Sequence, residues 1–114
     1  MKICIVLSTR PEIIKLSPLI RIFKEKKINF FLINTNQHYL NIMSTVFFKY
    51  FRVPKPKYNV LASTSNYNNF FSNTIGKIEK ILAKEKPNYL IVQGDTNTAL
   101  SGCFAASIFN KKKN

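Results

Sequence analysis

The sequence has very few acidic side chains, with five Asp and Glu against eighteen Lys and Arg, for a formal net charge of +13. Only Glu12 and Asp95 are plausible carboxylates for a site, so chemistry based on two carboxylates would need groups from elsewhere. A charge of this size attracts polyanions without specificity. The even spread of the lysines also fits a compositional bias in which they cover solvated helix faces. Charge alone therefore assigns no partner.

Cysteine, histidine and glycine are also scarce. Cys4 and Cys103 lie far apart, without metal-ligand spacing, and each sits in an apolar run where a free cysteine acts as a small hydrophobe. We therefore expect no disulfide, no metal site and a reducing compartment. With three glycines, the chain carries no dinucleotide fingerprint and no Walker loop after a strand, and no Ser/His/Asp order is visible.

Long hydrophobic runs are missing as well. Only five apolar residues separate Lys2 from Ser8, which is too short for the core of a signal peptide. No apolar stretch approaches the ~20 residues that a membrane span requires. We expect a cytoplasmic protein without a membrane partner. An apolar fraction of 46%, with ten Phe and five Tyr, is nevertheless enough to build the core of one domain or part of one.

Apolar runs alternate along the chain with segments of helical periodicity. The runs predict strands at 3–7, 30–33, 58–61 and 89–92, and the periodic segments predict helices at 9–27, 39–51, 71–86 and 98–109. We expect Pro18 to kink or break the first helix, and the last helix, which has little polar surface, to be well buried.

This alternation is typical of an α/β fold with a parallel, doubly wound, Rossmann-like sheet. Right-handed crossovers align the carboxyl ends of the strands, which would bring Arg10, His38 and Asp95 to one rim.

Arg10 and Lys15 are the first candidate binding residues. Arg10 falls at a predicted helix start, where Thr9 and Glu12 fit a capping box and backbone N–H groups favour anions. A guanidinium there can grip a phosphate, and Lys15 would add a second positive charge. The alternative is structural, with Arg10 paired to Glu12 or capping a neighbour and Lys15 simply solvated.

Asp95 and His38 are the candidate acid–base residues. Asp95 is the only Asp and follows Gly94, which permits a tight turn at the end of the fourth strand. Its carboxylate could accept a proton or orient a sugar hydroxyl, or Asp95 and Thr96 could merely cap the next helix. His38, the sole histidine, suits acid–base work by its pKa range but equally fits a hydrogen-bonding role in a polar loop.

Taken together, the motifs resemble the non-hydrolysing UDP-N-acetylglucosamine 2-epimerases. The family's usual forms are G-T-R-P-E-x-I-K-x-x-P, then Q-H after the second strand, and V-x-G-D-T-x-T after the fourth. This sequence carries S-T-R-P-E-I-I-K-L-S-P at 8–18, Q-H at 37–38 and V-Q-G-D-T-N-T at 92–98, in the same order along essentially its whole length.

The resemblance implies a glycosyltransferase-B-type fold, with the active site between two Rossmann-like domains. It implies inversion at C2 of UDP-GlcNAc to give UDP-ManNAc, a precursor of surface polysaccharides, by elimination and re-addition of UDP. No cofactor or obligatory metal is implied, and family members are typically dimers. By position, Arg10 and Lys15 match basic residues near the nucleotide-sugar, and Asp95 matches a ligand-binding, candidate catalytic aspartate. Gln37 and His38 match a loop that holds an allosteric UDP-GlcNAc in some bacterial members.

The sequence also departs from the family pattern. Leu40 and Asn73 stand where allosterically regulated members tend to carry a polar residue and an Arg, which puts the allosteric site in doubt. Residues 1–114 would form an incomplete N-terminal Rossmann-like domain, truncated after the fourth βα unit, with the C-terminal UDP-binding domain absent. We therefore expect the isolated chain to be inactive unless a C-terminal half is supplied in trans.

Two alternatives to the epimerase reading remain open at this point. The charge of +13 could mark a small basic module that binds nucleic acid, although the aromatic residues lie in apolar runs and not between Lys and Arg. We therefore expect no specific nucleic acid partner. The chain could instead be an interaction module whose unpaired fourth strand docks a partner polypeptide that completes the sheet.

Overall fold

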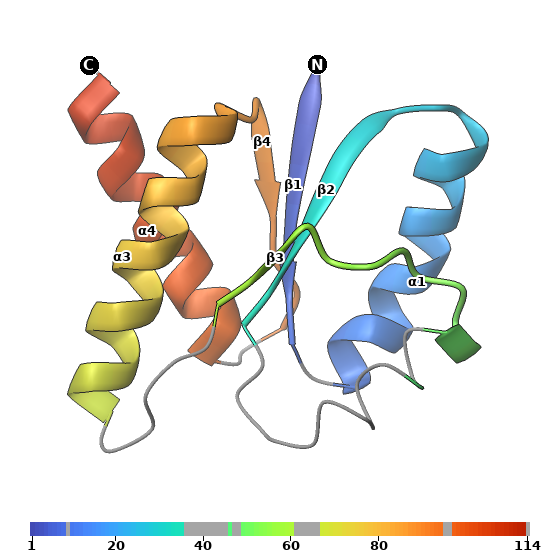
Figure 1. Cartoon of the computed structure of the whole chain (residues 1–114), viewed down its shortest axis with the longest axis horizontal. Coiled ribbons are helices and arrows are strands. Elements are labelled where there is room, and N and C mark those ends of the chain that lie inside the picture. Colours follow the sequence, from blue (N-terminus) through green and yellow to red (C-terminus); the bar gives the residue numbers. More distant parts are fainter. Residues whose placement is uncertain (9, 36–45, 47–48, 61–66, 95–96, 114) are drawn as a thin grey trace.

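The computed structural model describes residues 1–8, 10–35, 46, 49–60, 67–94 and 97–113. They form a parallel sheet with helices on both faces (Figure 1). The elements in chain order are β1 (Lys2–Leu7), α1 (Arg10–Glu25), β2 (Asn29–Asn34), β3 (Tyr58–Asn59), α3 (Tyr67–Glu85), β4 (Tyr89–Ile91) and α4 (Asn97–Lys113). The helix predicted at 39–51 falls largely outside the described residues, of which 46 and 49–50 are helical.

The sheet has four parallel strands in the order β3-β2-β1-β4, which confirms the predicted Rossmann-like α/β class. In its register Ile5 of β1 lies opposite Leu32 of β2 on one side and Ile91 of β4 on the other. Residues 3–7 are all buried, as expected of a parallel strand with helices over both faces.

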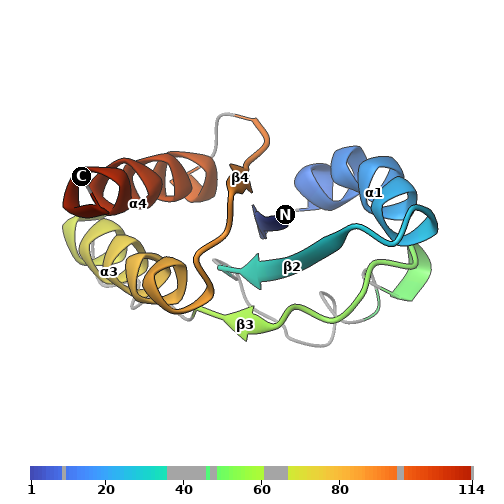
Figure 2. The ribbon, with the colours of Figure 1, turned by 90° about the horizontal axis from the view of Figure 1, so that it is seen from above.

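Two hydrophobic clusters lie on opposite faces of the sheet, because successive side chains of a strand point to opposite sides. The α1 side is built from Ile3, Ile5, Leu7, Ile13, Leu16, Ile20, Phe23, Leu32 and Val53. The opposite side, covered by α3 and α4 (Figure 2), is built from Cys4, Val6, Phe31, Ile33, Val60, Ile78, Leu82 and Ala105. Both cysteines are free, and Cys4 is buried.

Helix α1 runs without a break through Pro18, so a break there was the wrong expectation. Proline has no N–H, so the carbonyl of Ile14, four residues earlier, loses its normal helical partner. The hydroxyl of Ser17 donates a hydrogen bond of 3.0 Å to this carbonyl in its place. The exposed position of Pro18 leaves its ring clear of the core.

Helix α4 is buried on one face only, which corrects the expectation that it would be well buried. Its inner face comprises Thr98, Ala99, Ser101, Gly102 and Ala105. The outer face exposes Leu100, Cys103 and Phe104, because no described element lies over it. The helix also continues four residues past its predicted end at 109, to Lys113.

Gly102 lets α4 approach the sheet closely. A Cβ at this position would lie 2.7 Å from Cγ1 of Val92 and 3.5 Å from Cδ2 of Leu90. The first distance is too short for real carbon atoms, and Val92 is β-branched and therefore stiff about χ1. Gly76 of α3 differs, because a Cβ there would meet nothing within 4 Å.

We predict opposite effects for two Gly→Ala substitutions. Gly102→Ala should lower the free energy of unfolding by about 1 kcal/mol, because overpacking outweighs the gain in helix propensity. Gly76→Ala should raise it by up to about 1 kcal/mol. Urea denaturation checks both, and Val92→Ala should relieve the penalty at Gly102. If Gly102→Ala stabilised the protein while Val92 is unchanged, this would contradict the close approach of α4 to the sheet.

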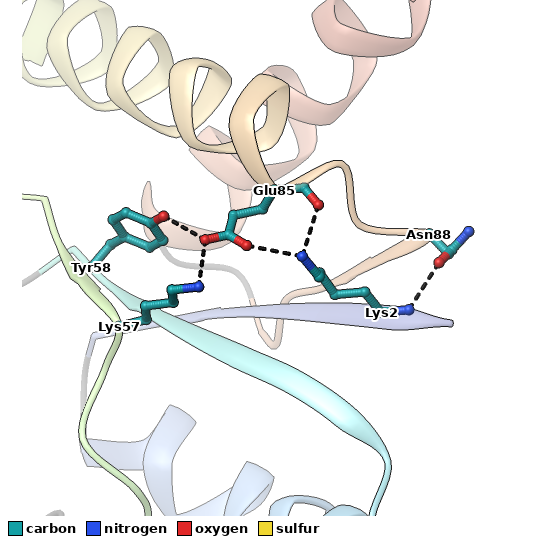
Figure 3. A network of polar contacts seen from close by, with 5 residues as sticks. All are labelled: Lys2, Lys57, Tyr58, Glu85 and Asn88. Atoms are coloured by element: carbon teal, nitrogen blue, oxygen red, sulfur yellow. Dashed lines mark hydrogen bonds and ion pairs between the residues drawn. The ribbon is translucent and has the colours of Figure 1, made fainter.

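At the amino end of the sheet a polar network ties three distant segments together (Figure 3). The Glu85 carboxylate at the end of α3 accepts hydrogen bonds from Nζ of Lys2 (3.0 Å) and the hydroxyl of Tyr58, and it pairs with Nζ of Lys57 at 2.7 Å. Asn88 and Lys2 exchange two further hydrogen bonds of 2.8 Å. The network holds the start of β1 to the start of β3 and to the turn before β4.

Glu85 is the centre of this network, with a side chain that is 7% exposed. Hydrogen bonds from Lys57, Tyr58 and Lys2 lower its pKa from 4.5 to about 2. The same hydrogen bonds raise the pKa of Lys57 and of Tyr58. A carboxyl with a lowered pKa in the folded state stabilises the fold above its unfolded pKa, and this contribution is lost as the pH falls through the folded value.

We therefore predict that Glu85→Gln lowers the urea midpoint at pH 7. The difference from wild type should shrink as the pH falls from 4.5 towards about 2, where the wild-type carboxyl itself is protonated. Glu79→Gln is the matched control, since the Glu79–Lys112 pair is far more exposed and such pairs contribute little. A Glu85→Gln effect that is independent of pH would contradict the assigned role of the charge.

Candidate functional site

The carboxyl ends of all four strands lie at one edge of the sheet, where α1 and α4 begin (lower edge in Figure 1). We call this edge the carboxyl rim. In open α/β sheets ligands bind outside this edge, and helix N-termini there favour anions. The described residues of the rim are joined by three sets of polar contacts.

The first contact lies between β1 and α1. The buried carboxylate of Glu12, in the first turn of α1, accepts a hydrogen bond of 2.8 Å from the backbone N–H of Ser8. A carboxylate there satisfies a free backbone donor and complements the helix dipole. The predicted capping box would join Glu12 to Thr9, which lies outside the described residues, so that pairing stays a prediction.

The second contact spans the sheet beneath the rim. Oγ1 of Thr35, directly after β2, shares a hydrogen bond of 2.8 Å with Oγ1 of Thr98 in the first turn of α4. Both side chains are fully buried. The backbone N–H of Thr35 also donates to the Leu7 carbonyl at 3.1 Å, so the β1–β2 pairing extends one residue beyond the strands. Sequence analysis missed this pair, since the motif shows Thr98 only as a helix start.

The third set joins β2 to β3. The side-chain amide of Asn34 donates to Oδ1 of Asn59 at 3.2 Å, and the backbone N–H of Val60 donates to the Asn34 carbonyl at 2.7 Å. Together the three sets fix the chain just before residues 36–45 and just after residues 95–96, next to predicted site residues.

Two of the five predicted site residues lie in the described part of the chain. Arg10 is the first residue of α1, and Lys15 is exposed on the same helix. Gln37, His38 and Asp95 lie outside the described residues.

The chain on either side of Asp95 is nevertheless defined. Gly94 has a φ of 84°, a left-handed conformation that favours glycine, and α4 begins three residues later at Asn97. The N-termini of α1 and α4 thus both lie at the rim, an arrangement suited to a phosphorylated ligand. Among the described residues no group of three or more His, Cys, Asp or Glu could hold a metal ion.

Comparison with known proteins identifies the family. The family model for UDP-N-acetylglucosamine 2-epimerase matches residues 21–112. The chain belongs to this family. It is 47% identical over 107 residues to the UDP-N-acetylglucosamine 2-epimerase of Methanocaldococcus jannaschii, covering 94% of this chain and 29% of that relative. It is 50% identical over 106 residues to that of Methanococcus maripaludis, covering 93% and 28%.

Solved structures of epimerases agree with this assignment. The Methanocaldococcus jannaschii UDP-GlcNAc 2-epimerase in complex with UDP-GlcNAc and UDP matches with a TM-score of 0.89 and 45% identity, over 96% of this chain and 30% of that one. The Neisseria meningitidis UDP-GlcNAc 2-epimerase bound to UDP-GlcNAc matches with a TM-score of 0.84 and 28% identity, over 98% and 30%.

The chain therefore spans less than a third of the length of these relatives. The resemblance read from the motifs is confirmed at the level of family and fold. The relatives are sugar-nucleotide enzymes and lend no support to the nucleic-acid alternative. None of the described helices has the length and apolar character needed to cross a membrane.

We predict that the buried threonine pair stabilises the rim. Thr98→Val leaves the Thr35 hydroxyl buried without its partner, which should lower the free energy of unfolding by about 1–3 kcal/mol. Replacing both residues by valine should cost less than the single change, because two apolar groups need no hydrogen bond. Urea unfolding of both single variants and the double variant checks this, and simple additivity would contradict it.

Proposed function

We propose that this chain forms the first part of a UDP-N-acetylglucosamine 2-epimerase, which interconverts UDP-GlcNAc and UDP-ManNAc. The reaction removes the C2 proton and expels UDP, then returns UDP and delivers a proton to the opposite face of C2. The observation that carries the proposal is the match to an epimerase structure that holds UDP-GlcNAc and UDP, over 96% of this chain at 45% identity.

The residue roles extend this proposal to the carboxyl rim. Arg10 is the first residue of a 16-residue helix, whose N-terminus favours an anionic nucleotide-sugar, and Lys15 lies exposed on the same helix. We assign Asp95, the residue after Gly94 in the sequence, to substrate binding and proton transfer. Gln37 and His38 match the family's loop for a second, allosteric UDP-GlcNAc, but Asn73, exposed on α3 in place of the family's Arg, argues against that subsite in this chain.

The proposal also covers what the chain needs from outside itself. Residues 1–114 match about 30% of the epimerase structure and would by themselves form part of one Rossmann-like domain. The chain alone should not turn over substrate, and the remaining part must be supplied in cis or in trans. A cytoplasmic location and a dimeric assembly like that of the family belong to the same proposal.

The test is conversion of UDP-GlcNAc by the chain alone and by the chain mixed with the remaining part of the Methanococcus maripaludis relative. We expect turnover only in the mixture. Asp95→Asn should lower it by at least about 100-fold, the contribution typical of a general acid–base group.

Glu79→Gln is the matched control, because it also removes one carboxylate but lies on α3 in an exposed ion pair. Its turnover should equal that of the wild type. A folded, associated mixture without turnover would refute the proposed function, and full activity of Asp95→Asn would refute the role of Asp95.

A further inference from the structure

Four hydroxyl side chains among the described residues are fully buried, but they differ in their partners. Thr35, Thr74, Thr98 and Ser101 are each 0% exposed. The Oγ atoms of Thr74 and Ser101 have no hydrogen-bond partner in the described part of the chain. Those of Thr35 and Thr98 are joined at 2.8 Å, across 63 residues of sequence. Burial of a hydroxyl does not by itself produce a pair in this fold, so the Thr35–Thr98 pair calls for a physical reason.

Thr35 is held firmly by the sheet. Its backbone N–H donates to the Leu7 carbonyl at 3.1 Å, which continues the pairing of β1 with β2. On the other side of β2, the carbonyl of Asn34 accepts a hydrogen bond of 2.7 Å from the N–H of Val60. The end of β2 is therefore fixed from both sides, and the Thr35 hydroxyl is a fixed point for any group bound to it.

Thr98 uses this fixed point to place the first turn of α4. Further along the helix, the contact with the sheet is apolar and runs through Gly102, which lies against Val92 and Leu90. Apolar contacts are not directional, whereas a hydrogen bond requires a defined distance and angle. The bond from Thr98 to Thr35 thus sets the start of α4 relative to β2 more narrowly than apolar packing would.

Stability alone does not require hydroxyls at these two positions. A buried apolar pair of the same shape can be about as stable as a hydrogen-bonded pair, because it leaves no polar group without a partner. Valine has nearly the shape of threonine, so two valines would fill the same space. They would lack the directional link, and a satisfied buried hydrogen bond is a means of specifying one arrangement of a core.

The pair lies next to a residue of the proposed site. Asp95 comes three residues before Thr98 in the sequence and three residues after Val92. Val92 packs against the hydrophobic cluster beneath α3 and α4, and Thr98 is held by its hydrogen bond. Because consecutive Cα atoms are only about 3.8 Å apart, a displacement of Thr98 is passed on to its near neighbours in the chain.

We propose that Thr35 and Thr98 are a positioning pair for the epimerase reaction, whose hydrogen bond holds the start of α4 where Asp95 can act on the sugar-nucleotide. Both side chains are fully buried, so the pair acts through α4 and Asp95 and not by touching the substrate. Misplacing a reacting group by about 1 Å can cost about 100-fold in rate. The inference rests on the proposed function, which gives Asp95 its role.

The first test needs no catalysis. Amide hydrogen exchange of the full chain, followed by NMR, reports how firmly the start of α4 is held. In Thr35→Val/Thr98→Val the amide of Ser101, in the first hydrogen-bonded turn of α4, should exchange at least about fivefold faster, as expected for one lost hydrogen bond. The amide of Ile78 in α3 should exchange as in the wild type. Equal exchange at Ser101 in the two proteins would overturn the proposal.

The second test measures turnover in the mixture with the remaining part of the Methanococcus maripaludis relative. Thr35→Val/Thr98→Val should keep a urea midpoint close to that of the wild type but lose at least about tenfold in kcat. Thr98→Ser keeps the hydroxyl and should recover most of this loss. Ser101→Ala is the matched control, since it removes a buried α4 hydroxyl that has no partner, and its kcat should equal that of the wild type.

A double-mutant cycle with Asp95→Asn separates positioning from a loss of folded protein. If the pair acts through Asp95, the two valines should not lower kcat further once Asp95→Asn is present. Additive losses would overturn the proposal. An active wild-type mixture in which the valines leave kcat unchanged would overturn the positioning role alone. A wild-type mixture without turnover would refute the proposed function and, with it, the positioning role that rests on it.

Discussion

The burial of β1 on all sides is the constraint on which the rest of the structure depends. Its backbone pairs with β2 and β4, and its side chains alternate between two clusters, so both faces need a helix. Polar groups at its ends must then find partners near the strand itself. At one end the N–H of Lys2 finds Asn88, and at the other the Leu7 carbonyl finds Thr35. The contact between Leu7 and Thr35 at the carboxyl rim therefore follows from the burial of β1.

Much of the fold could be predicted from the sequence. The continuous apolar runs of β1 and β2 indicate buried strands, and the periodic apolar residues of α1 and α3 indicate helices. The continuity of α1 could not be predicted. It depends on the Ser17 hydroxyl, which donates a hydrogen bond to the Ile14 carbonyl that Pro18 leaves without a backbone partner. The exposed side of α4 could not be predicted either. Its composition shows that it is apolar, but only the packing of Gly102 shows which side faces the sheet.

The family could be predicted from the sequence, because the motifs at 8–18, 37–38 and 92–98 stand in the family's order, and the comparisons confirm it. The contacts that support the candidate site could not. The contacts that hold the rim join residues far apart in the sequence, such as Thr35 with Thr98 and Asn34 with Asn59. Hydroxyl and amide side chains are too common for their pairing to be read from spacing alone.

The ends of the described chain lie on the side of the molecule opposite the carboxyl rim. β1 starts and α4 finishes at the edge where Glu85 joins Lys2 and Lys57, while the strands end at the other edge (Figure 1). An affinity handle or a surface linker at residue 1 or beyond residue 113 would therefore project away from the rim. A chain immobilised by either end would present its carboxyl rim to solution.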